Sequence, residues 1–252
     1  MSFDVAADAY DRFMGRYSRH LSPQLADFAG VAAGARVLDV GCGPGALTAE
    51  LVRRTGAGRV AAADPSASFV EAVRARHPGV EVHVAGAEDL PFPGDAFDAT
   101  LAQLVVPFMR DPAAGLAQMR RVTRRGGTVA ASAWDHAGGR SPLAPLWAAV
   151  REHDPAAANE ARVAGAGEGR LPALLEAAGL GEVEEVAHEV QVRHESFEEW
   201  WEPFSLGVGP AGAYVARLDP AGREALRERC RARLGDGPLE LTVFAWAARG
   251  TA

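Results

Sequence analysis

An apolar strand that runs into an acidic residue and three closely spaced glycines constrains this chain more than any other feature. Residues 36–45 read Arg-Val-Leu-Asp-Val-Gly-Cys-Gly-Pro-Gly, and a helical pattern follows over residues 46–54. Glycine adopts backbone angles that other residues avoid, and it lets a ligand approach the main chain closely. The segment therefore predicts a strand, a tight turn and a helix that presents free N–H groups to a polar ligand at the carboxyl end of a parallel sheet.

The glycine spacing alone leaves two classes of cofactor open. Gly41, Gly43 and Ala46 satisfy the pattern G-x-G-x-x-G/A, which suits NAD, FAD or S-adenosylmethionine. Asp39 favours the last of these, because a carboxylate repels a pyrophosphate and attracts an ammonium or sulfonium group. The purely structural alternative is a tight turn with a buried capping Asp39.

At this point the sequence resembles motif I of the class I S-adenosylmethionine-dependent methyltransferases. Their acid followed by G-x-G-x-G is met by Asp39, Gly41, Gly43 and Gly45, and the resemblance extends over roughly residues 36–134. It implies S-adenosylmethionine as cofactor, S-adenosylhomocysteine as product, and in-line methyl transfer to an oxygen, nitrogen or carbon of a small organic acceptor. Since positioning supplies much of such catalysis, the absence of an obvious base does not argue against activity.

Alternating strand and helix patterns predict an α/β fold, and the resemblance makes it a Rossmann-like doubly wound sheet of seven strands. The sheet is expected to be mostly parallel, with the last strand inserted antiparallel beside the fifth. The expected strands cover residues 36–40, 59–63, 80–85, 97–105, 127–133, 183–192 and 238–247. The expected helices lie near residues 45–55, 66–76, 112–124, 142–152 and 170–178.

The 252 residues are expected to form a single methyltransferase domain, 1–252, with one substantial core. Within it we expect an N-terminal helical cap over residues 1–34 and a cofactor-binding core over 35–134. Helical lid insertions over 135–169 and 193–237 are expected to shape the acceptor pocket.

Composition narrows the choice of partners. The formal net charge is −7 and all 26 basic residues are arginine, so nucleic acid is not expected as a partner. The absence of lysine excludes a P-loop, a Schiff-base enzyme and a Tyr-x-x-x-Lys dehydrogenase. Cys42 and Cys230 match no zinc spacing, so no metal is expected. With no long apolar run, we expect a cytoplasmic protein without membrane contact, acting as a monomer or homodimer.

Asp64 is the next cofactor candidate, because it ends the second strand 19 residues after Gly45. A carboxylate at that spacing can accept hydrogen bonds from both ribose hydroxyls. The alternative interpretation is that Asp64-Pro65 is an ordinary helix cap followed by proline.

The resemblance assigns further cofactor contacts. It implies that Ala87 meets the adenine ring through its backbone, that Glu88 accepts from the adenine amino group, and that Gln103 lies near the methionine part. Asp89 is the alternative polar wall, and Gly86 departs from the family, which commonly has Asp there. We also expect Cys42 and Pro65 at the cofactor, and Arg16 at the methionine carboxylate. The full set is Arg16, Asp39, Gly41, Cys42, Gly43, Gly45, Asp64, Pro65, Ala87, Glu88 and Gln103.

Two aromatic stripes at helical spacing are the candidates for the acceptor pocket, although such stripes are more often core. They contribute Tyr10, Phe13, Tyr17, Trp200 and Trp201. His136 is the first candidate for a general base, because it follows the fifth strand at the edge of the sheet where ligands bind. His20 and Tyr17, on the N-terminal helix, are the other catalytic candidates.

Two other functions stay open from the sequence. An NAD(P)- or flavin-dependent oxidoreductase agrees with the glycines and Asp64, but Asp39 and the missing Tyr-x-x-x-Lys pair oppose it. A non-catalytic protein that binds S-adenosylmethionine would retain the same motif.

Overall fold

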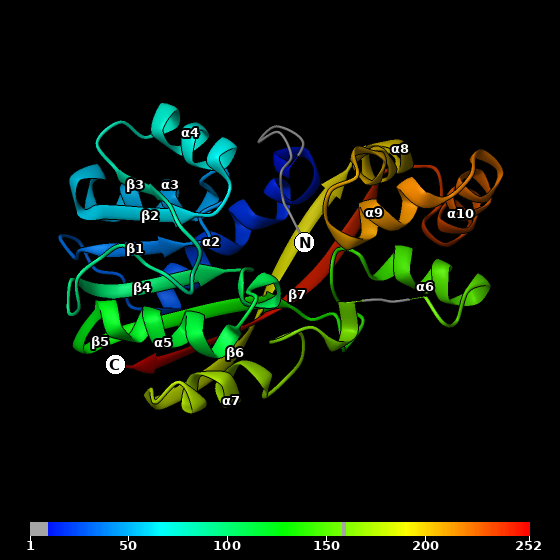
Figure 1. Ribbon diagram of the computed structural model, residues 1–252. Coiled ribbons are helices and arrows are strands. Elements are labelled where there is room, and N and C mark those ends of the chain that lie inside the picture. Colours follow the sequence, from blue (N-terminus) through cyan, green and yellow to red (C-terminus); the bar gives the residue numbers. More distant parts are fainter. Residues whose placement is uncertain (1–9, 158–159) are drawn as a thin grey trace.

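The computed structural model describes residues 10–157 and 160–252. Seven strands form one sheet in the order β3-β2-β1-β4-β5-β7-β6 (Figure 1). The strands are β1 Val37–Val40, β2 Val60–Asp64, β3 Glu81–Val84, β4 Phe97–Gln103, β5 Thr123–Trp134, β6 Gly181–His194 and β7 Leu239–Thr251. Strand β7 pairs antiparallel with both β5 and β6, and the other pairs are parallel. The predicted seven-stranded sheet with its last strand antiparallel beside the fifth is confirmed.

The helices connect these strands on both faces. They are α2 Arg16–Phe28, α3 Ala46–Thr55, α4 Ala67–Arg76, α5 Pro112–Val122, α6 Ala144–His153, α7 Arg170–Ala177, α8 Phe197–Trp201, α9 Gly209–Arg217 and α10 Pro220–Leu234. Shorter helical turns are η1 Asp11–Gly15, η2 Ala57–Arg59, η3 Val106–Phe108, η4 Glu160–Arg162 and η5 Glu202–Leu206. The five predicted helices each lie within two residues of an observed one.

Several strand ends differ from prediction, and three of the differences follow from the strand pairing or the backbone angles. Strand β5 begins at Thr123 rather than 127, because Thr123 pairs with Phe97 before an irregularity in the ladder. Strand β4 ends at Gln103, since Leu104 turns out of the strand with φ +64°. Strand β7 continues to Thr251, four residues past the predicted end, and there pairs with Thr128 and Gly181.

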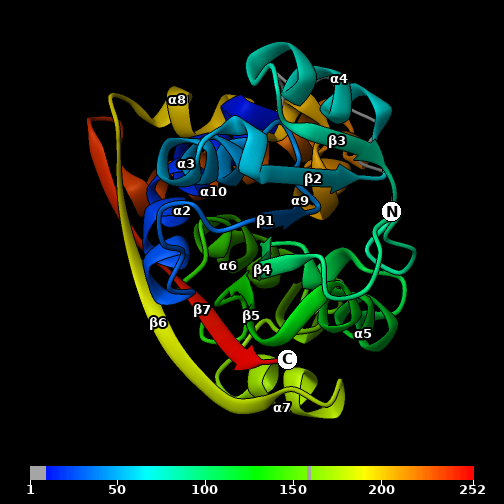
Figure 2. The ribbon, with the colours of Figure 1, turned by 90° about the vertical axis from the view of Figure 1, so that its left-hand side faces the viewer.

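The central strands β1 and β2 are buried along their whole length, as expected for strands covered on both faces. One face packs against α2 and α3 through a cluster that includes Leu25, Leu47 and Leu101. The other face packs against α5 and α7 through a cluster that includes Leu116 and Leu171. Figure 2 shows the two pairs of helices on opposite sides of the sheet.

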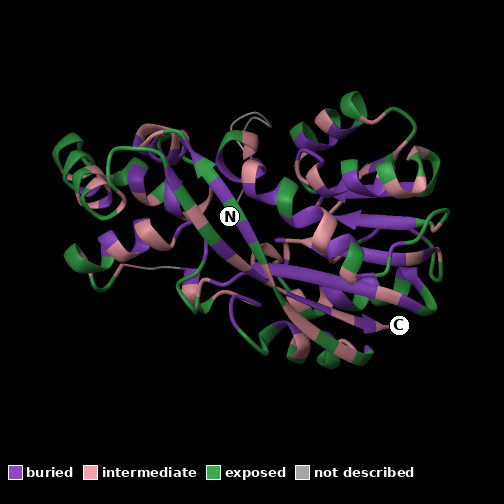
Figure 3. Ribbon diagram, turned by 180° about the vertical axis from the view of Figure 1, so that it is seen from behind, coloured by how far each residue is buried: buried purple, intermediate pink, exposed green. Residues whose placement is uncertain are grey.

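A second apolar core lies where β6 and β7 extend past the parallel strands. Helices α6, α8, α9 and α10 gather around these extensions (Figure 1). The cluster joins Phe13 and Tyr17 of the N-terminal segment to Trp147, Trp200 and Val243. Buried residues therefore continue from the sheet into this part of the molecule, and exposed residues concentrate on outer helix surfaces and loops (Figure 3). The described residues of the two predicted lid segments therefore contribute to this packed core.

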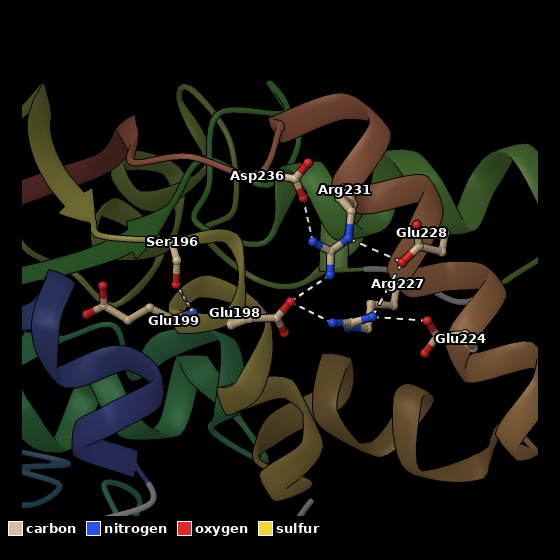
Figure 4. Close-up of polar contacts among 8 residues, drawn as sticks. All are labelled: Ser196, Glu198, Glu199, Glu224, Arg227, Glu228, Arg231 and Asp236. Carbon is tan, nitrogen blue, oxygen red and sulfur yellow. Dashed lines mark hydrogen bonds and ion pairs between the residues drawn. The ribbon is translucent and has the colours of Figure 1, made fainter.

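Ion pairs connect α8 to α10 on the outside of this second core. Glu198 accepts hydrogen bonds from Arg227 and Arg231, each at 2.6 Å, and Arg231 also contacts Asp236 at 2.5 Å (Figure 4). The Glu198 side chain is 43% exposed, so these pairs align the two helices more than they stabilise them.

The expected division into cap, core and lids stays a prediction. Residues 1–9 of the cap and residues 158–159 of the first lid lie outside the described part of the chain. Among the described helices, none combines the length and apolar character needed to cross a membrane. The same residues contain no cluster of His, Cys, Asp and Glu arranged to hold a metal ion.

Candidate cofactor and acceptor site

A cavity of about 630 Å³ lies at the carboxyl edge of the parallel strands. The ends of β1, β2 and β4 and the loop after β3 all reach it, as expected for a ligand site in an open α/β sheet. Its walls are Tyr10, Gly41, Gly43, Asp64, Pro65, Ser66, Ala67, Phe69, Gly86, Ala87, Glu88, Gln103, Leu104, Val105, Phe108, Met109 and Arg110. Seven of the predicted cofactor residues are therefore brought together in one cavity.

The glycine turn presents bare backbone to this cavity. Gly41 has φ +68°, and a Cβ there would lie 2.5 Å from Val105 Cγ2. Gly43 has φ +52°, and among the described residues a Cβ there would meet only Tyr10 Cε1, at 4.0 Å. Gly45 plays a different part, since its Cβ would crowd Val73 of α4 at 3.2 Å, and it does not line the cavity. Gly41 and Gly43 thus shape the site, whereas Gly45 serves helix packing.

Asp64 links the glycine turn to the second strand. Its Oδ2 accepts from the Gly43 N–H at 2.9 Å and its Oδ1 accepts from the Ser66 N–H at 2.8 Å. Ser66 is the N-cap residue of α4, so Asp64 lies just before the helix and its carboxylate supports the helix start through the Ser66 N–H. Burial raises the pKa of Asp64, although the two backbone hydrogen bonds oppose the rise. The carboxylate is held in place with lone pairs left for a ligand's hydroxyl groups.

Asp39 lies beneath the turn and is not among the residues that line the cavity. It is 1% exposed, and its Oδ2 accepts from Thr48 Oγ1 at 2.6 Å. Its Oδ1 is buried with no hydrogen-bond partner among the described residues. Burial raises the pKa of Asp39 to about 7, with the Asp64 charge adding to the rise and the Thr48 hydrogen bonds opposing it. Asp39 therefore lies behind the turn and is not a wall of the cavity.

The loop after β3 is held by backbone hydrogen bonds. Glu88 Oε1 accepts from the N–H groups of Arg110 at 2.7 Å and Asp111 at 3.2 Å. Burial opposes ionisation of Glu88, but its own N–H and those of Asp111 and Arg110 hold the pKa below its usual value. Ala87 and Glu88 face the cavity, whereas Asp89 is exposed and outside it.

Gln103 and Cys42 differ in their access to the cavity. The Gln103 Nε2 donates to the Ser18 carbonyl at 3.1 Å, and its Oε1 is buried with no partner among the described residues. Cys42 is buried beside the turn, its thiol pKa is raised by burial, and it does not line the cavity. Gln103 is thus available to a ligand, and Cys42 acts as a small turn residue.

Arg16 and Tyr17 lie away from the cofactor cavity, which corrects the predicted place of Arg16. Arg16 Nη1 contacts Glu199 Oε1 at 3.0 Å and donates to His194 Nδ1 at 2.8 Å. The Tyr17 hydroxyl lies 2.9 Å from His194 Nε2, in the buried interior. These groups join α2 to the end of β6 and the start of α8. The helical spacing indicated a shared face but not which neighbour that face would meet.

The remaining pocket and catalytic candidates are divided between core and surface. Trp200 and Trp201 are 3% and 5% exposed and pack with Phe197 and Phe204. Trp200 lines a cavity of only about 10 Å³ together with Tyr17. Trp201 and His20 line neither this cavity, nor the large one, nor another of about 40 Å³, and His20 is exposed.

A second, smaller cavity adjoins the first, and the two share Tyr10, Leu104 and Phe108 as wall residues. His136 lies on its wall, as does Phe13. Glu160, also on this wall, was missed from the sequence, because it lies in a glycine- and alanine-rich stretch with no periodic pattern. A single carboxylate in such a stretch gives no sequence signal.

Comparisons with known proteins agree with this geometry. Residues 38–131 match the family model described as a methyltransferase domain. An uncharacterized methyltransferase of Mycobacterium tuberculosis is 35% identical over 129 residues, covering 51% of this chain and 50% of the relative. A malonyl-[acyl-carrier protein] O-methyltransferase of Erwinia billingiae is 33% identical over 128 residues, with the same coverage. The chain spans about half the length of these curated relatives.

A solved structure from Anaeromyxobacter dehalogenans, a candidate type II methyltransferase, superposes with a TM-score of 0.65. It is 23% identical and covers 94% of this chain and 97% of its own, so it supports the fold. Residues 38–131 are therefore similar to a methyltransferase domain, and the sheet order agrees with the fold of class I S-adenosylmethionine-dependent methyltransferases. The cofactor is S-adenosylmethionine, and the bare turn at Gly43 beside the Asp64 carboxylate fits a ligand that carries ribose hydroxyls.

Proposed function

We propose that this chain transfers a methyl group from S-adenosylmethionine to an oxygen, nitrogen or carbon of a small organic acceptor. One observation carries the proposal: the cofactor cavity and a second cavity share Tyr10, Leu104 and Phe108. A shared wall suits a reaction between two bound molecules, because catalysis here depends on holding two atoms in line.

When bound, the cofactor supplies a methyl group on a sulfonium that is already a good leaving group. Asp64 would bind the ribose, Ala87 and Glu88 the adenine, and Gln103 the methionine part. The buried Asp39 carboxylate would favour the cofactor's positive charge from beneath the turn. The protein's main contribution is position and exclusion of water.

His136 is the base that the site can offer. Burial lowers the pKa of His136 to about 4, against the opposing charge of Asp135, so the imidazole is neutral near pH 7. A neutral imidazole at a cavity wall can take a proton from the molecule that is methylated. His20 is exposed and Tyr17 is engaged with His194, so neither supports a catalytic part.

We further propose a cytoplasmic enzyme that acts as a monomer or homodimer and binds no nucleic acid. Cys42 and Cys230, both free and buried, agree with a reducing compartment.

Calorimetry with S-adenosylhomocysteine and NAD tests the cofactor part of the proposal. We expect S-adenosylhomocysteine to bind and NAD not to bind, whereas the reverse would favour an oxidoreductase. Asp64→Asn removes one acceptor oxygen and should weaken S-adenosylhomocysteine binding about tenfold or more. Asp219→Asn, at the N-cap of α10, is the matched control and should leave the affinity unchanged. A non-catalytic protein would bind the cofactor yet methylate no acceptor.

A further inference from the structure

The second cavity is small and almost entirely apolar. It holds about 40 Å³, room for two or three water molecules, so it admits only a small end of an acceptor. Its walls are Tyr10, Phe13, Met14, Leu104, Pro107, Phe108, Trp134, His136, Leu143, Glu160, Gly209, Pro210 and Ala211. No arginine is among these described wall residues, although arginine is the chain's sole basic residue apart from histidine.

Two titratable side chains break the apolar lining. Glu160 is 4% exposed and accepts a hydrogen bond from Trp147 Nε1 at 2.8 Å, which fixes its carboxyl group. His136 has a buried Nδ1 with no hydrogen-bond partner among the described residues. A buried nitrogen without a partner is costly, so a ligand that pairs with it gains binding energy.

The backbone at the junction of the two cavities has an unusual conformation. Leu104 has φ +64°, a conformation that branched side chains rarely adopt, and its N–H donates to the Ser132 carbonyl at 2.9 Å. Strained backbone of this kind is found preferentially at functional sites. The conformation of Leu104 turns the chain at the end of β4 and places this residue on the walls of both cavities.

Building on the proposed methyl transfer, we propose that this cavity receives the hydroxyl-bearing end of an uncharged, largely apolar acceptor. Glu160 is the residue that sets this specificity. Its carboxylate repels an acidic acceptor, and no wall arginine offsets the repulsion. An uncharged hydroxyl group is not repelled by this carboxylate, and it can donate a hydrogen bond to an accepting atom on the cavity wall.

His136 is the catalytic residue of this proposal. The hydroxyl oxygen forms the new bond to the methyl carbon, and the methyl–sulfur bond breaks with its electron pair returning to sulfur. The hydroxyl proton passes to an imidazole nitrogen of His136 and from there to solvent. The products are a methyl ether and S-adenosylhomocysteine, so atoms and charge balance.

The test measures binding of two small probes, phenol and benzoate, to the protein loaded with S-adenosylhomocysteine at pH 8. Phenol should bind about tenfold more tightly than benzoate, because one ionic repulsion inside a protein is worth this much or more. Glu160→Gln keeps the size of the side chain and should reduce the ratio to about threefold or less. Glu168→Gln, an exposed residue of the same segment, is the matched control and should not change the ratio.

A substitution that fills the cavity tests whether phenol binds there. Ala211 is fully buried on the wall, and Ala211→Leu should abolish phenol binding while leaving S-adenosylhomocysteine binding unchanged. If Ala211→Leu does not fold, the smaller substitution Ala211→Val takes its place, because Gly209 on the same wall has φ +65° and would be strained by a side chain.

The outcomes are distinguishable. Loss of S-adenosylhomocysteine binding in the unmodified protein would defeat the proposed function itself. If S-adenosylhomocysteine binds, the inference is overturned by equal or tighter binding of benzoate, by failure of phenol to bind, or by a ratio that Glu160→Gln leaves unchanged.

Discussion

At the scale of single residues, the candidate cofactor site contains two aspartates in different positions. Asp64 reaches the cavity and fixes the glycine turn through its bond to the Gly43 N–H, whereas Asp39 is buried behind the turn against Thr48. The sequence indicated both acids by their distance from the glycines. Only the folded chain shows that Asp64 lines the cavity and that Asp39 lies behind the turn, outside the cavity wall.

The pKa of Asp39 makes the stability of the cofactor-free protein depend on pH. Burial raises this pKa from 3.8 to about 7, so between these values the folded state holds a proton that the unfolded chain has lost. The free energy of unfolding should therefore fall as pH rises from 4 to 7, by up to about 4 kcal/mol from this group.

Asp39→Asn removes that titration and keeps an acceptor for Thr48. Urea unfolding at pH 5 and pH 8 should show a smaller loss of stability in this variant than in the unmodified protein. Part of the loss of stability with rising pH should remain in both proteins, because the pKa values of Asp64 and Glu160 are also raised. Parallel pH profiles for the two proteins would contradict the expected role of Asp39.

The glycine turn offers a second test at this scale. Gly41→Ala combines a positive φ with a Cβ 2.5 Å from Val105 Cγ2, whereas Gly34→Ala has φ +80° and open space around its Cβ. Gly34→Ala should cost about 1 kcal/mol of stability from backbone strain alone. Gly41→Ala should cost more and also weaken S-adenosylhomocysteine binding. Equal costs for the two variants would show that contact with Val105 is unimportant.

At the scale of elements, α8 anchors the segments that surround β6 and β7. Trp201 stacks on Phe197 with an angle of 13° between the rings, and Trp200 packs edge to face on Phe204 at 4.9 Å. The sequence identified this stripe correctly as an amphipathic face and placed it at the acceptor. The structure assigns Trp201 to the core, because the extended β6 and β7 provide an apolar surface there.

Trp201→Ala should consequently reduce the free energy of unfolding by about 3–5 kcal/mol, as for other large buried aromatic residues. Its effect on S-adenosylhomocysteine affinity should be small wherever the variant remains folded. Tyr214→Ala on α9, a half-buried aromatic, is the control and should cost less. A stability loss for Trp201→Ala no larger than the control's would argue against a core role.

At the scale of the whole molecule, the cofactor-binding half and the outer half share one sheet. Strand β7 pairs with β5 from Thr128 to Trp134 and with β6 along nearly its full length. Leu171 and Leu175 of α7 complete the core beneath β5. The cofactor half is therefore not expected to fold without the strands that come last in the chain.

A fragment of residues 35–134 tests this dependence. Without β7 it would expose the long apolar edge of β5, and such edges aggregate. We expect no cooperative unfolding transition and no S-adenosylhomocysteine binding from the fragment under conditions where the full chain shows both. A folded fragment that binds would establish residues 35–134 as an independent domain.

The sequence by itself determined the order of elements, the turn at Gly41 and Gly43, and the acid at Asp64, because these follow from local backbone geometry and periodicity. It also placed the last strand through the family resemblance. Only the tertiary structure decided which aromatic residues are core, where Arg16 finds its partners, and that Glu160 and His136 line the same cavity. Those contacts join segments far apart in the chain, and local patterns carry no information about such neighbours.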